Sequence, residues 1–254
     1  MINNIIEKQV EIIVKDGYFE LPQELQNKIK DFWNKCLENN PNLWDGDVMC
    51  ISECKIEKDI IIMTCQKTKY SHYLYDERVG LPKEYGCNNM AAGSLIETSD
   101  HYYVVGELAE NMSYPRCMQL PGGNADNSDI KDGKINILDT IIRETREELN
   151  INLEDESQVE KFKINYIAMP TEDVHTYVIF AKCSLKMTKE ELQNHYDKYV
   201  EYLKENNLEI EFGKIHFLKK GETTEQLAAL DNPKRNYLVE LLEVDNEVNK
   251  VYIK

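Results

Sequence analysis

The sequence predicts an α+β fold, because its candidate strands and helices mix without the regular strand–helix–strand alternation of a doubly wound parallel sheet. Several candidate strands come in pairs separated by short turns, as in antiparallel hairpins. The texture of the sequence changes near Asn88, which divides the 254 residues into a small N-terminal α/β extension, residues 1–84, and a larger domain, residues 85–254. A chain of this length can hold one large domain with a substantial extension.

The extension is expected to contain one strand, one helix and one hairpin. Alternating apolar residues predict the strands, whereas Leu25, Ile29 and Trp33 recur at helical spacing. The segment N39-N-P-N-L-W-D-G-D then breaks the helical pattern with proline, asparagine and glycine. In chain order, the elements are a strand at residues 9–14, a helix at 21–37, a hairpin of 49–56 with 59–65, and a connector at 73–86.

The larger domain is expected to hold a strand pair around S99-D-H, an acidic helix, further strands and two more helices. The helix that follows Thr188 begins with a T-x-x-E capping box that includes Glu191. The sequence contains no internal repeat and no low-complexity tract. The elements are strands at residues 91–98, 102–108, 162–169, 176–183 and 208–218, and helices at about 139–149, 188–205 and 236–242.

Composition and charge exclude several classes of function. Hydrophobic residues make up 42% and charged residues 30% of the chain, and no apolar run approaches the roughly 18 residues of a membrane span. The N-terminus lacks the features of a secretory signal, so a cytoplasmic protein is expected. The net charge of −16 argues against binding to nucleic-acid backbones or anionic membranes. It permits a small anionic substrate if a bound divalent metal reverses the local charge.

The cysteines indicate reduced thiols rather than a zinc site or a disulfide framework. There are seven, an odd number, and they are scattered without any C-x-x-C spacing. Structural zinc sites need closely spaced ligand pairs, and cytoplasmic thiols stay reduced.

The acidic helix carries Glu144, Glu147 and Glu148 opposite an apolar stripe that contains Ile141 and Leu149. Acids three and four residues apart repel each other by roughly 0.2–0.5 kcal/mol per pair. The cluster is therefore either a solvated face or a site for a cation. Asn150 is expected to end the helix in the left-handed conformation.

The turn Pro121-Gly122-Gly123 precedes this helix and exposes backbone groups. Clustered carboxylates together with a backbone carbonyl are ligands that Mg²⁺ or Mn²⁺ prefers. The turn and the helix together therefore predict a site for a hard divalent cation.

The stretch R143-E-T-R-E-E-L-N-I closely resembles the end of the Nudix box, G-x5-E-x7-R-E-U-x-E-E-x-G-U, in which U is aliphatic. Residues on its defined positions are Arg143, Glu144, Glu147, Glu148 and Ile151. Pro121-Gly122-Gly123 resembles the glycine turn that opens the box. The resemblance implies a Nudix fold, a mixed sheet sandwiched between helices, and an enzyme that hydrolyses nucleoside diphosphates linked to another group with Mg²⁺ or Mn²⁺.

The match departs from the box at three places. Thr145 takes an aliphatic position, and Asn150 replaces the late glycine. The loop between Gly123 and Arg143 also contains an insertion of about six residues, which displaces the first acid of the box. Either Asp129 supplies that acid, or Asp139 takes over its partnership with Arg143.

Three further segments resemble a narrower branch, the Nudix enzymes that cleave UDP-glucose and UDP-galactose. N39-N-P-N-L-W-D-G-D resembles N-P-x-L-x-D-G, T68-K-Y is similar to T-x-Y, and C183-S-L-K-M-T-K-E-E-L-Q-N-H-Y resembles C-S-L-T-x-E-x-x-x-x-H-Y. This resemblance implies hydrolysis of a UDP-sugar to UMP and a sugar 1-phosphate. Each segment also has a structural interpretation, as a turn or as packing.

The resemblance implies roles for the box residues. Glu144 and Glu148 would be metal ligands, Glu147 a further ligand or the base that takes a proton from water, and the Gly123 carbonyl a fourth ligand. Arg143 would pair with a glutamate and hold it in place. A base from outside the box is also common in the family, and the candidates are Glu172, Glu209 and Glu211.

Substrate contacts are expected from Gly122, Gly123 and Tyr70, although packing is an alternative role for this tyrosine. Two other functions stay open: a diphosphatase for ADP-ribose or another nucleoside diphosphate derivative, and a non-catalytic Nudix-fold sensor of such ligands. The expected partner is a small nucleoside diphosphate compound. Nudix proteins are often dimers, so the resemblance also makes a homodimer one possible state of this chain.

Overall fold

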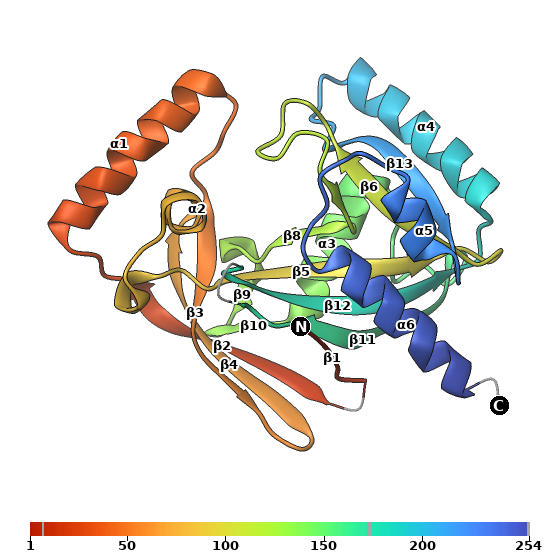
Figure 1. Cartoon of the computed structure of the whole chain (residues 1–254), viewed down its shortest axis with the longest axis horizontal. Coiled ribbons are helices and arrows are strands. Elements are labelled where there is room, and N and C mark those ends of the chain that lie inside the picture. The colour runs from red at the N-terminus through yellow and green to blue at the C-terminus, as the bar shows by residue number, and fades with distance from the viewer. Residues whose placement is uncertain (7, 172–173, 253–254) are drawn as a thin grey trace.

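A computed structural model describes residues 1–6, 8–171 and 174–252 of the chain (Figure 1). Within these ranges the strands form one mixed sheet, which contains both parallel and antiparallel pairs and has helices packed on its faces. The fold is therefore α+β, as the sequence predicts. No helix in the described ranges is long and apolar enough to cross a membrane.

The strands are β1 (Ile2–Asn4), β2 (Gln9–Tyr18), β3 (Asp47–Ile56), β4 (Ile60–Lys69), β5 (Asn89–Glu97), β6 (Tyr102–Leu108), β7 (Met118–Gln119), β8 (Gly122–Asn124), β9 (Ile130–Lys131), β10 (Lys134–Ile135), β11 (Val159–Ala168), β12 (Thr176–Leu185) and β13 (Phe212–Lys219). The helices are α1 (Gln23–Asn39), α2 (Tyr70–Val79), α3 (Ile137–Leu149), α4 (Lys189–Glu205), α5 (Thr223–Ala228) and α6 (Leu238–Tyr252), with short 3-10 turns η1 (Lys83–Tyr85) and η2 (Asn127–Asp129).

The long path through the sheet has the order β1-β11-β12-β5-β3-β4-β2-β10-β9. Strands β5 and β12 run parallel at its centre, and β2 runs parallel to β4. Strand β6 pairs with β5, β7 and β13, whereas β8 pairs with β5. The acidic helix and the glycine turn are therefore both anchored next to the central strand β5.

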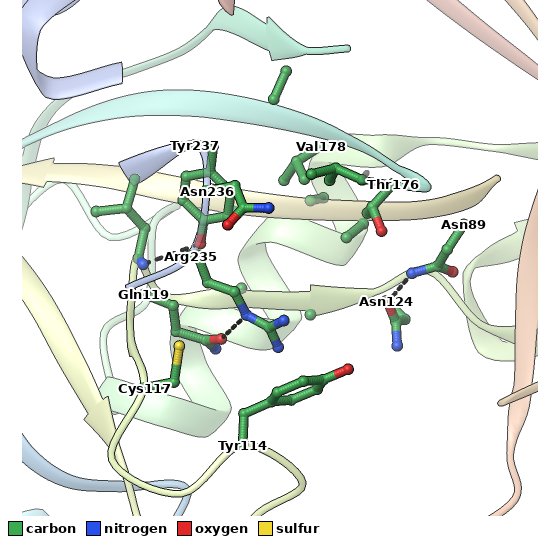
Figure 2. A pocket seen from close by; sticks show the side chains of 18 of the residues that line it. Asn89, Tyr114, Cys117, Gln119, Asn124, Thr176, Val178, Arg235, Asn236 and Tyr237 are labelled. Carbon is green, nitrogen blue, oxygen red and sulfur yellow. Dashed lines mark hydrogen bonds between the residues drawn. The ribbon is translucent and has the colours of Figure 1, made fainter. Parts of the chain in front are cut away.

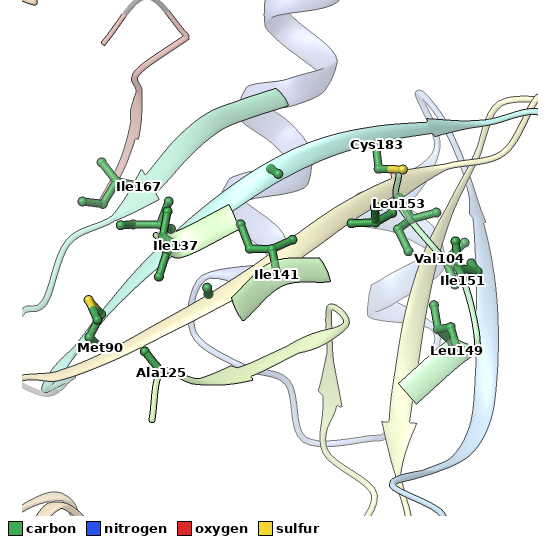
Figure 3. Packing of buried hydrophobic residues seen from close by; sticks show 14 of the residues in the cluster. Met90, Val104, Ala125, Ile137, Ile141, Leu149, Ile151, Leu153, Ile167 and Cys183 are labelled. Atoms are coloured by element: carbon green, nitrogen blue, oxygen red, sulfur yellow. The ribbon is translucent and has the colours of Figure 1, made fainter. Parts of the chain in front are cut away.

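Two hydrophobic clusters cover the two faces of the central strands. Met90 and Ile96 of β5 belong to the cluster that contains Ile141 of α3 (Figure 3). Leu95 of the same strand belongs to the other cluster, which contains Leu241 of α6. Because successive side chains of a strand point to opposite faces, one strand serves both clusters. The sheet is thus sandwiched between α3 and α6 (Figure 1).

Strands of the N-terminal extension continue the same sheet. Cys50 of β3 pairs with Asn89 of β5, and the short strand β1 pairs with β11. Strand β10 of the larger domain pairs with β2 of the extension, so the two parts are joined at a further place in the sheet. The boundary between residues 84 and 85 stays a prediction, because one sheet runs through both parts.

The prediction of a connector at residues 73–86 is wrong, because residues 73–79 belong to α2 and residues 83–85 form η1. Helix α2 spans Tyr70–Val79, and its residues His72, Tyr73 and Leu74 are all buried. Burial on several sides removes the apolar stripe by which an amphipathic helix is recognised. Gly80, with a φ of 86°, ends the helix in a conformation that glycine adopts readily.

The inserted loop after the glycine turn forms a small hairpin. Strands β9 and β10 are joined by Asp132 and Gly133, whose φ angles are 51° and 70°. Two positive φ angles are typical of a type I′ turn, for which Asp-Gly is a favoured sequence.

Several boundaries also differ from the predicted ones by two or more residues. Strand β2 continues to Tyr18, β4 continues to Lys69, and β11 begins at Val159. The last strand begins at Phe212 rather than at residue 208, and the last helix continues to Tyr252.

Helix α6 is tied to the sheet by the buried carboxylate of Asp245. Lys182 Nζ of β12 lies 2.6 Å from its Oδ2, and Tyr166 of β11 donates to its Oδ1 at 2.6 Å. Tyr103 of β6 also donates to Asp245. Burial raises the pKa of this carboxyl group, but Lys182 and the two tyrosines outweigh burial, so the pKa is lowered overall.

We expect Asp245→Asn to lower the free energy of unfolding by about 1–3 kcal/mol at pH 7, because it leaves Lys182 without its nearest counter-charge. The pKa of Asp245 is lowered by folding, so its stabilising effect is present above the unfolded pKa of about 4 and is lost as the pH falls through the folded pKa. Denaturant unfolding of both proteins between pH 7 and pH 3 would measure this narrowing difference. The exposed Asp231→Asn should show neither effect.

Candidate functional site

Helix α3 is capped by an asparagine at each end, Asn136 before its first residue and Asn150 after its last. The side chain of Asn136 caps its start by accepting a hydrogen bond from the backbone N–H of Leu138 at 3.4 Å. Asn150 ends it with φ 55° and ψ 33°, the left-handed conformation expected from the sequence. The helix runs from Ile137, two residues earlier than predicted.

The glycine turn packs directly against the acidic face of α3. The backbone N–H of Gly122 donates to Glu148 Oε2 at 2.6 Å. A Cβ on Gly122 would overlap the backbone of Ala92, and a Cβ on Gly123 would lie 2.5 Å from Glu144 Oε2. Gly122 needs glycine because the turn lies against the backbone of β5, whereas a side chain at Gly123 would displace the carboxylate of Glu144.

Arg143 connects the helix to the inserted segment. Its Nη2 lies 3.0 Å from Asp129 Oδ2, and its Nη1 lies 2.6 Å from Glu144 Oε1 and 3.3 Å from Glu147 Oε2. Asp129 is buried, whereas Asp139 pairs with Lys131 at 2.6 Å. Of the two acids that the sequence leaves open, Asp129 is therefore the partner of Arg143.

Thr145, at an aliphatic position of the box, is fully buried between the helix and the sheet. Its hydroxyl donates to the carbonyl of Ile141 at 2.7 Å and lies 2.9 Å from the hydroxyl of Ser94 on β5. A buried hydroxyl with such partners carries little penalty, so the substitution is accommodated locally.

The three glutamates of the box differ in burial. Glu144 and Glu148 are buried, at 7% and 3% exposure, whereas the Glu147 side chain is 55% exposed. Burial raises the pKa of Glu144 to about 8, with repulsion from Glu211 and Glu147 adding to the effect and Arg143 opposing it. Burial and repulsion from Glu211 and Glu144 also raise the pKa of Glu148 well above its usual range.

Glu211 belongs to the same acid cluster, although it lies more than sixty residues further along the chain. It immediately precedes β13 and is half-buried, and its pKa is raised by burial and by repulsion from Glu209 and Glu147. Glu209, the other candidate base on this segment, is exposed. Glu172, the third candidate, lies outside the described residues.

One oxygen of the cluster has no donor. Glu148 Oε1 is buried and accepts no hydrogen bond from the part of the chain that the structure describes. A proton on a neighbouring carboxyl group, a water molecule or a bound cation would satisfy this oxygen. An orphaned buried carboxylate oxygen is a reason to expect a cation.

The donor types in the cluster fit a hard divalent cation. The carboxylates of Glu144 and Glu148 lie against the glycine turn, and Glu211 adds a third carboxylate to the cluster. As they stand, no three His, Cys, Asp or Glu side chains in the described ranges are spaced to hold a metal ion. Arg143 Nη1 forms an ion pair with Glu144 Oε1, so the arginine and a bound metal would have to share that carboxylate.

A cavity of about 670 Å³ opens beside the glycine turn and is lined by both parts of the chain (Figure 2). Gly122, Gly123 and Glu211 form the wall next to the acid cluster. Tyr70 also lines the cavity, while its ring packs edge-on against Trp33 at 6.1 Å. The other polar and aromatic lining residues are Tyr73, Glu77, Asn89, Ser113, Tyr114, Gln119, Asn124, Thr171, Thr176, Phe180, Lys234, Arg235, Asn236, Tyr237 and Glu240.

Asn124 links the cavity to the acidic helix. Its side-chain oxygen accepts from Asn89 Nδ2 at 2.6 Å, and its backbone carbonyl accepts from Arg143 Nη2 at 3.4 Å (Figure 2). Sequence reasoning missed Asn89, Asn124 and Arg235 as cavity residues. Only the position of Asn124, directly after the two glycines, could have indicated it.

No family model and no curated protein matches the chain, but solved structures do. The Ap4A hydrolase binary complex of C. elegans is 16% identical, with 65% of this chain and 98% of that chain covered and a TM-score of 0.38. A Nudix hydrolase from Nitrosomonas europaea is 14% identical, covering 64% and 90%, with a TM-score of 0.36. A bifunctional NMN adenylyltransferase/ADP ribose pyrophosphatase from Francisella tularensis, complexed with AMP and a Mn ion, is 14% identical, covering 62% and 41%, with a TM-score of 0.39.

We expect Asp129→Asn to lower the free energy of unfolding by about 1–3 kcal/mol, because it removes a buried charge partner of Arg143. The matched variant Asp139→Asn removes a more exposed ion pair and should cost less than about 1 kcal/mol. Equilibrium denaturation of the two variants and the wild type would measure the difference. An equal or larger cost for Asp139→Asn would contradict the assignment of Asp129 as the partner of Arg143.

Proposed function

We propose that this protein is a metal-dependent hydrolase that cleaves the pyrophosphate bond of a nucleoside diphosphate-linked compound. The observation that carries this proposal is the buried acid cluster of α3 and Glu211, which adjoins the glycine turn at the wall of the cavity. A purely solvated acidic face would not bury two of its carboxylates or leave one oxygen without a donor. The sequence resemblance to the Nudix box supports the same reaction.

A pyrophosphate bridge resists attack by water because both phosphorus centres carry negative charge. Divalent metal, when bound, neutralises that charge and lowers the pKa of water. Glu144, Glu148 and the Gly123 carbonyl are the groups that would hold the metal, and the exposed Glu147 could add a ligand. Arg143, anchored by Asp129, holds Glu144 on the side of the helix that faces the turn.

In the proposed reaction, water forms a new bond to one phosphorus, and the bridging P–O bond breaks. The departing phosphate takes the bonding electron pair, and a protein carboxylate accepts the proton from the water. Glu211 is our choice for that base, because it lines the cavity and stands beside Glu148. Glu147 is the alternative base within the box.

A UDP-sugar, giving UMP and a sugar 1-phosphate, is the substrate that we favour. Two of the three segments that resemble the UDP-sugar branch contact each other: Asp45 Oδ1 accepts from the backbone N–H of Ser71 at 2.7 Å, and the carbonyl of Gly46 accepts from the backbone N–H of Tyr70 at 2.9 Å. Tyr70, at the end of the second segment, lines the cavity. These contacts fix the start of α2 and hence Tyr70. The amides and hydroxyls of the cavity suit a base and a sugar.

Turnover assays with Mg²⁺ and a panel of UDP-glucose, UDP-galactose, ADP-ribose and a dinucleoside polyphosphate test this proposal. Phosphate released from the products by an added phosphatase gives the rate. We expect UDP-sugars to be the best substrates and Glu148→Gln to lower kcat by at least about 100-fold, because the variant loses a negative ligand. Calorimetric titration with Mn²⁺ should show weaker metal binding by the same variant.

Glu201→Gln, on the exposed face of α4, is the control and should keep full activity. If ADP-ribose were hydrolysed faster than the UDP-sugars, the substrate would be another nucleoside diphosphate derivative and not a UDP-sugar. Ligand binding without turnover in any metal would identify a sensor instead of an enzyme. Full activity in Glu148→Gln would show that the metal assignment is wrong.

We expect Glu211→Gln to lower kcat by about 100-fold or more with little change in KM, because an amide cannot take the proton from water. Glu209→Gln is the matched control two residues away, and its exposed side chain should be dispensable. Steady-state kinetics on the best substrate of the panel would separate the two. Comparable losses in both variants would point to a general electrostatic effect of this segment and not to a base at Glu211.

A further inference from the structure

Arg235 lies in the segment before α6 and enters the cavity at some distance along the chain from every box residue (Figure 2). Its Nε donates to Gln119 Oε1 at 3.3 Å, and its guanidinium carbon lies 4.1 Å from the centre of the Tyr114 ring. Its backbone N–H also donates to the carbonyl of Met118 at 2.9 Å. The backbone of Arg235 is thus held by Met118, the Nε edge of its guanidinium by Gln119, and one face of the guanidinium by the Tyr114 ring.

The outer edge of this guanidinium has no partner among the residues that the structure describes. Within the described ranges, neither terminal nitrogen of Arg235 makes a hydrogen bond, and no carboxylate lies at ion-pair distance from it. The chain has 46 acidic and 30 basic residues, so acidic side chains outnumber the basic ones that could pair with them. An arginine without an acidic partner is therefore unexpected in this chain. A half-buried cation that is held in place yet unpaired is suited to an anion that arrives with a ligand.

The other charged side chains that line the cavity are acidic or already hydrogen-bonded to the protein. Glu77, Glu211 and Glu240 are acidic. Lys234, the remaining basic residue among those that line the cavity, donates its Nζ to the carbonyls of Leu230 and Asn232 at 2.6 and 2.9 Å. Met1 also lines the cavity, and its amino group lies 3.5 Å from Glu240 Oε2. Among the described lining residues, Arg235 is therefore the basic side chain whose terminal nitrogens are left for a ligand.

Arg235 is also within electrostatic reach of the acid cluster. The hydroxyl of Tyr237 accepts a hydrogen bond from the backbone N–H of Leu120 at 3.2 Å, next to the glycine turn. Burial raises the pKa of Tyr237, Arg235 opposes this rise, and Glu148 adds to it. The charges of Arg235 and Glu148 therefore both act on the hydroxyl group of Tyr237.

We propose that Arg235 binds a phosphoryl group of the ligand through its two terminal nitrogens, and thereby holds phosphorylated compounds in the cavity before metal is bound. The planar fork of a guanidinium matches two oxygens of a phosphate, which a lysine ammonium cannot do. Tyr114 and Gln119 are the positioning residues, because they fix the plane of the fork. This inference rests on the proposed function for the identity of the ligand, but binding can be measured without turnover.

Titration calorimetry in EDTA, with UDP and with inorganic pyrophosphate as probes, tests the role of Arg235. Arg235→Ala should weaken the binding of both probes by about 10- to 100-fold, because a charge-assisted bidentate contact is lost. Arg235→Lys, which keeps the charge and loses the fork, should fall between Arg235→Ala and the wild type. A thermal melt of each variant would show that the chain still folds, and Arg235→Gln serves if the alanine variant does not.

Arg78→Ala is the matched control. Arg78 also stacks on the Tyr114 ring, at 5.5 Å from its centre, but it does not line the cavity. Its removal should change the affinity for either probe by less than about threefold, since any effect through Tyr114 alone is indirect. Equal losses in Arg78→Ala and Arg235→Ala would assign the effect to Tyr114 and overturn the proposal.

Unchanged affinity in Arg235→Ala would also overturn it, as would a wild type that binds neither probe at millimolar concentration. Failure of the proposed function looks different: UDP would bind in an Arg235-dependent way, but no compound of the panel would be hydrolysed with any metal. Conversely, hydrolysis with the same KM in wild type and Arg235→Ala would leave the proposed function standing and remove the role of Arg235.

Discussion

The close approach of the glycine turn to α3 is the constraint on which the candidate site depends. Gly122 donates its N–H to Glu148, and Gly123 leaves room for the carboxylate of Glu144. The contact buries two acids that repel each other, at a cost that the apolar stripe of α3 offsets through Ile141 and its neighbours against the sheet. The site is thus held together by hydrophobic packing on one side of the helix and is electrostatically unfavourable on the other until a cation or protons arrive.

The N-terminal extension contributes to the site in two places. Helix α2 brings Tyr70 to the cavity, and β2 supports the hairpin whose preceding turn carries Asp129. Asp129 in turn holds Arg143 against the box glutamates. The extension therefore supports both a wall of the cavity and the acid cluster, although it lies outside the segment that resembles the Nudix box.

Local patterns in the sequence predicted much of the fold and the helical part of the site. Glu144 and Glu148 could be placed together because residues four apart share one side of a helix, and Asn150 could be placed because asparagine tolerates positive φ. The choice between Asp129 and Asp139 could not be made, since only the folded hairpin brings Asp129 to Arg143. Arg235 was missed for a similar reason, because its contacts with Gln119 and Tyr114 join segments more than a hundred residues apart.

The inserted hairpin has a further effect on how this protein behaves in a crowded solution. The long path of the sheet ends in β9, a strand of two residues, at one side and in β1, a strand of three, at the other. A long edge strand with unpaired backbone groups is a template for pairing with another chain, and short edges that carry lysine, such as Lys131, discourage this. The segment that interrupts the box thus covers part of β2, which would otherwise offer ten residues of open edge to a neighbouring molecule.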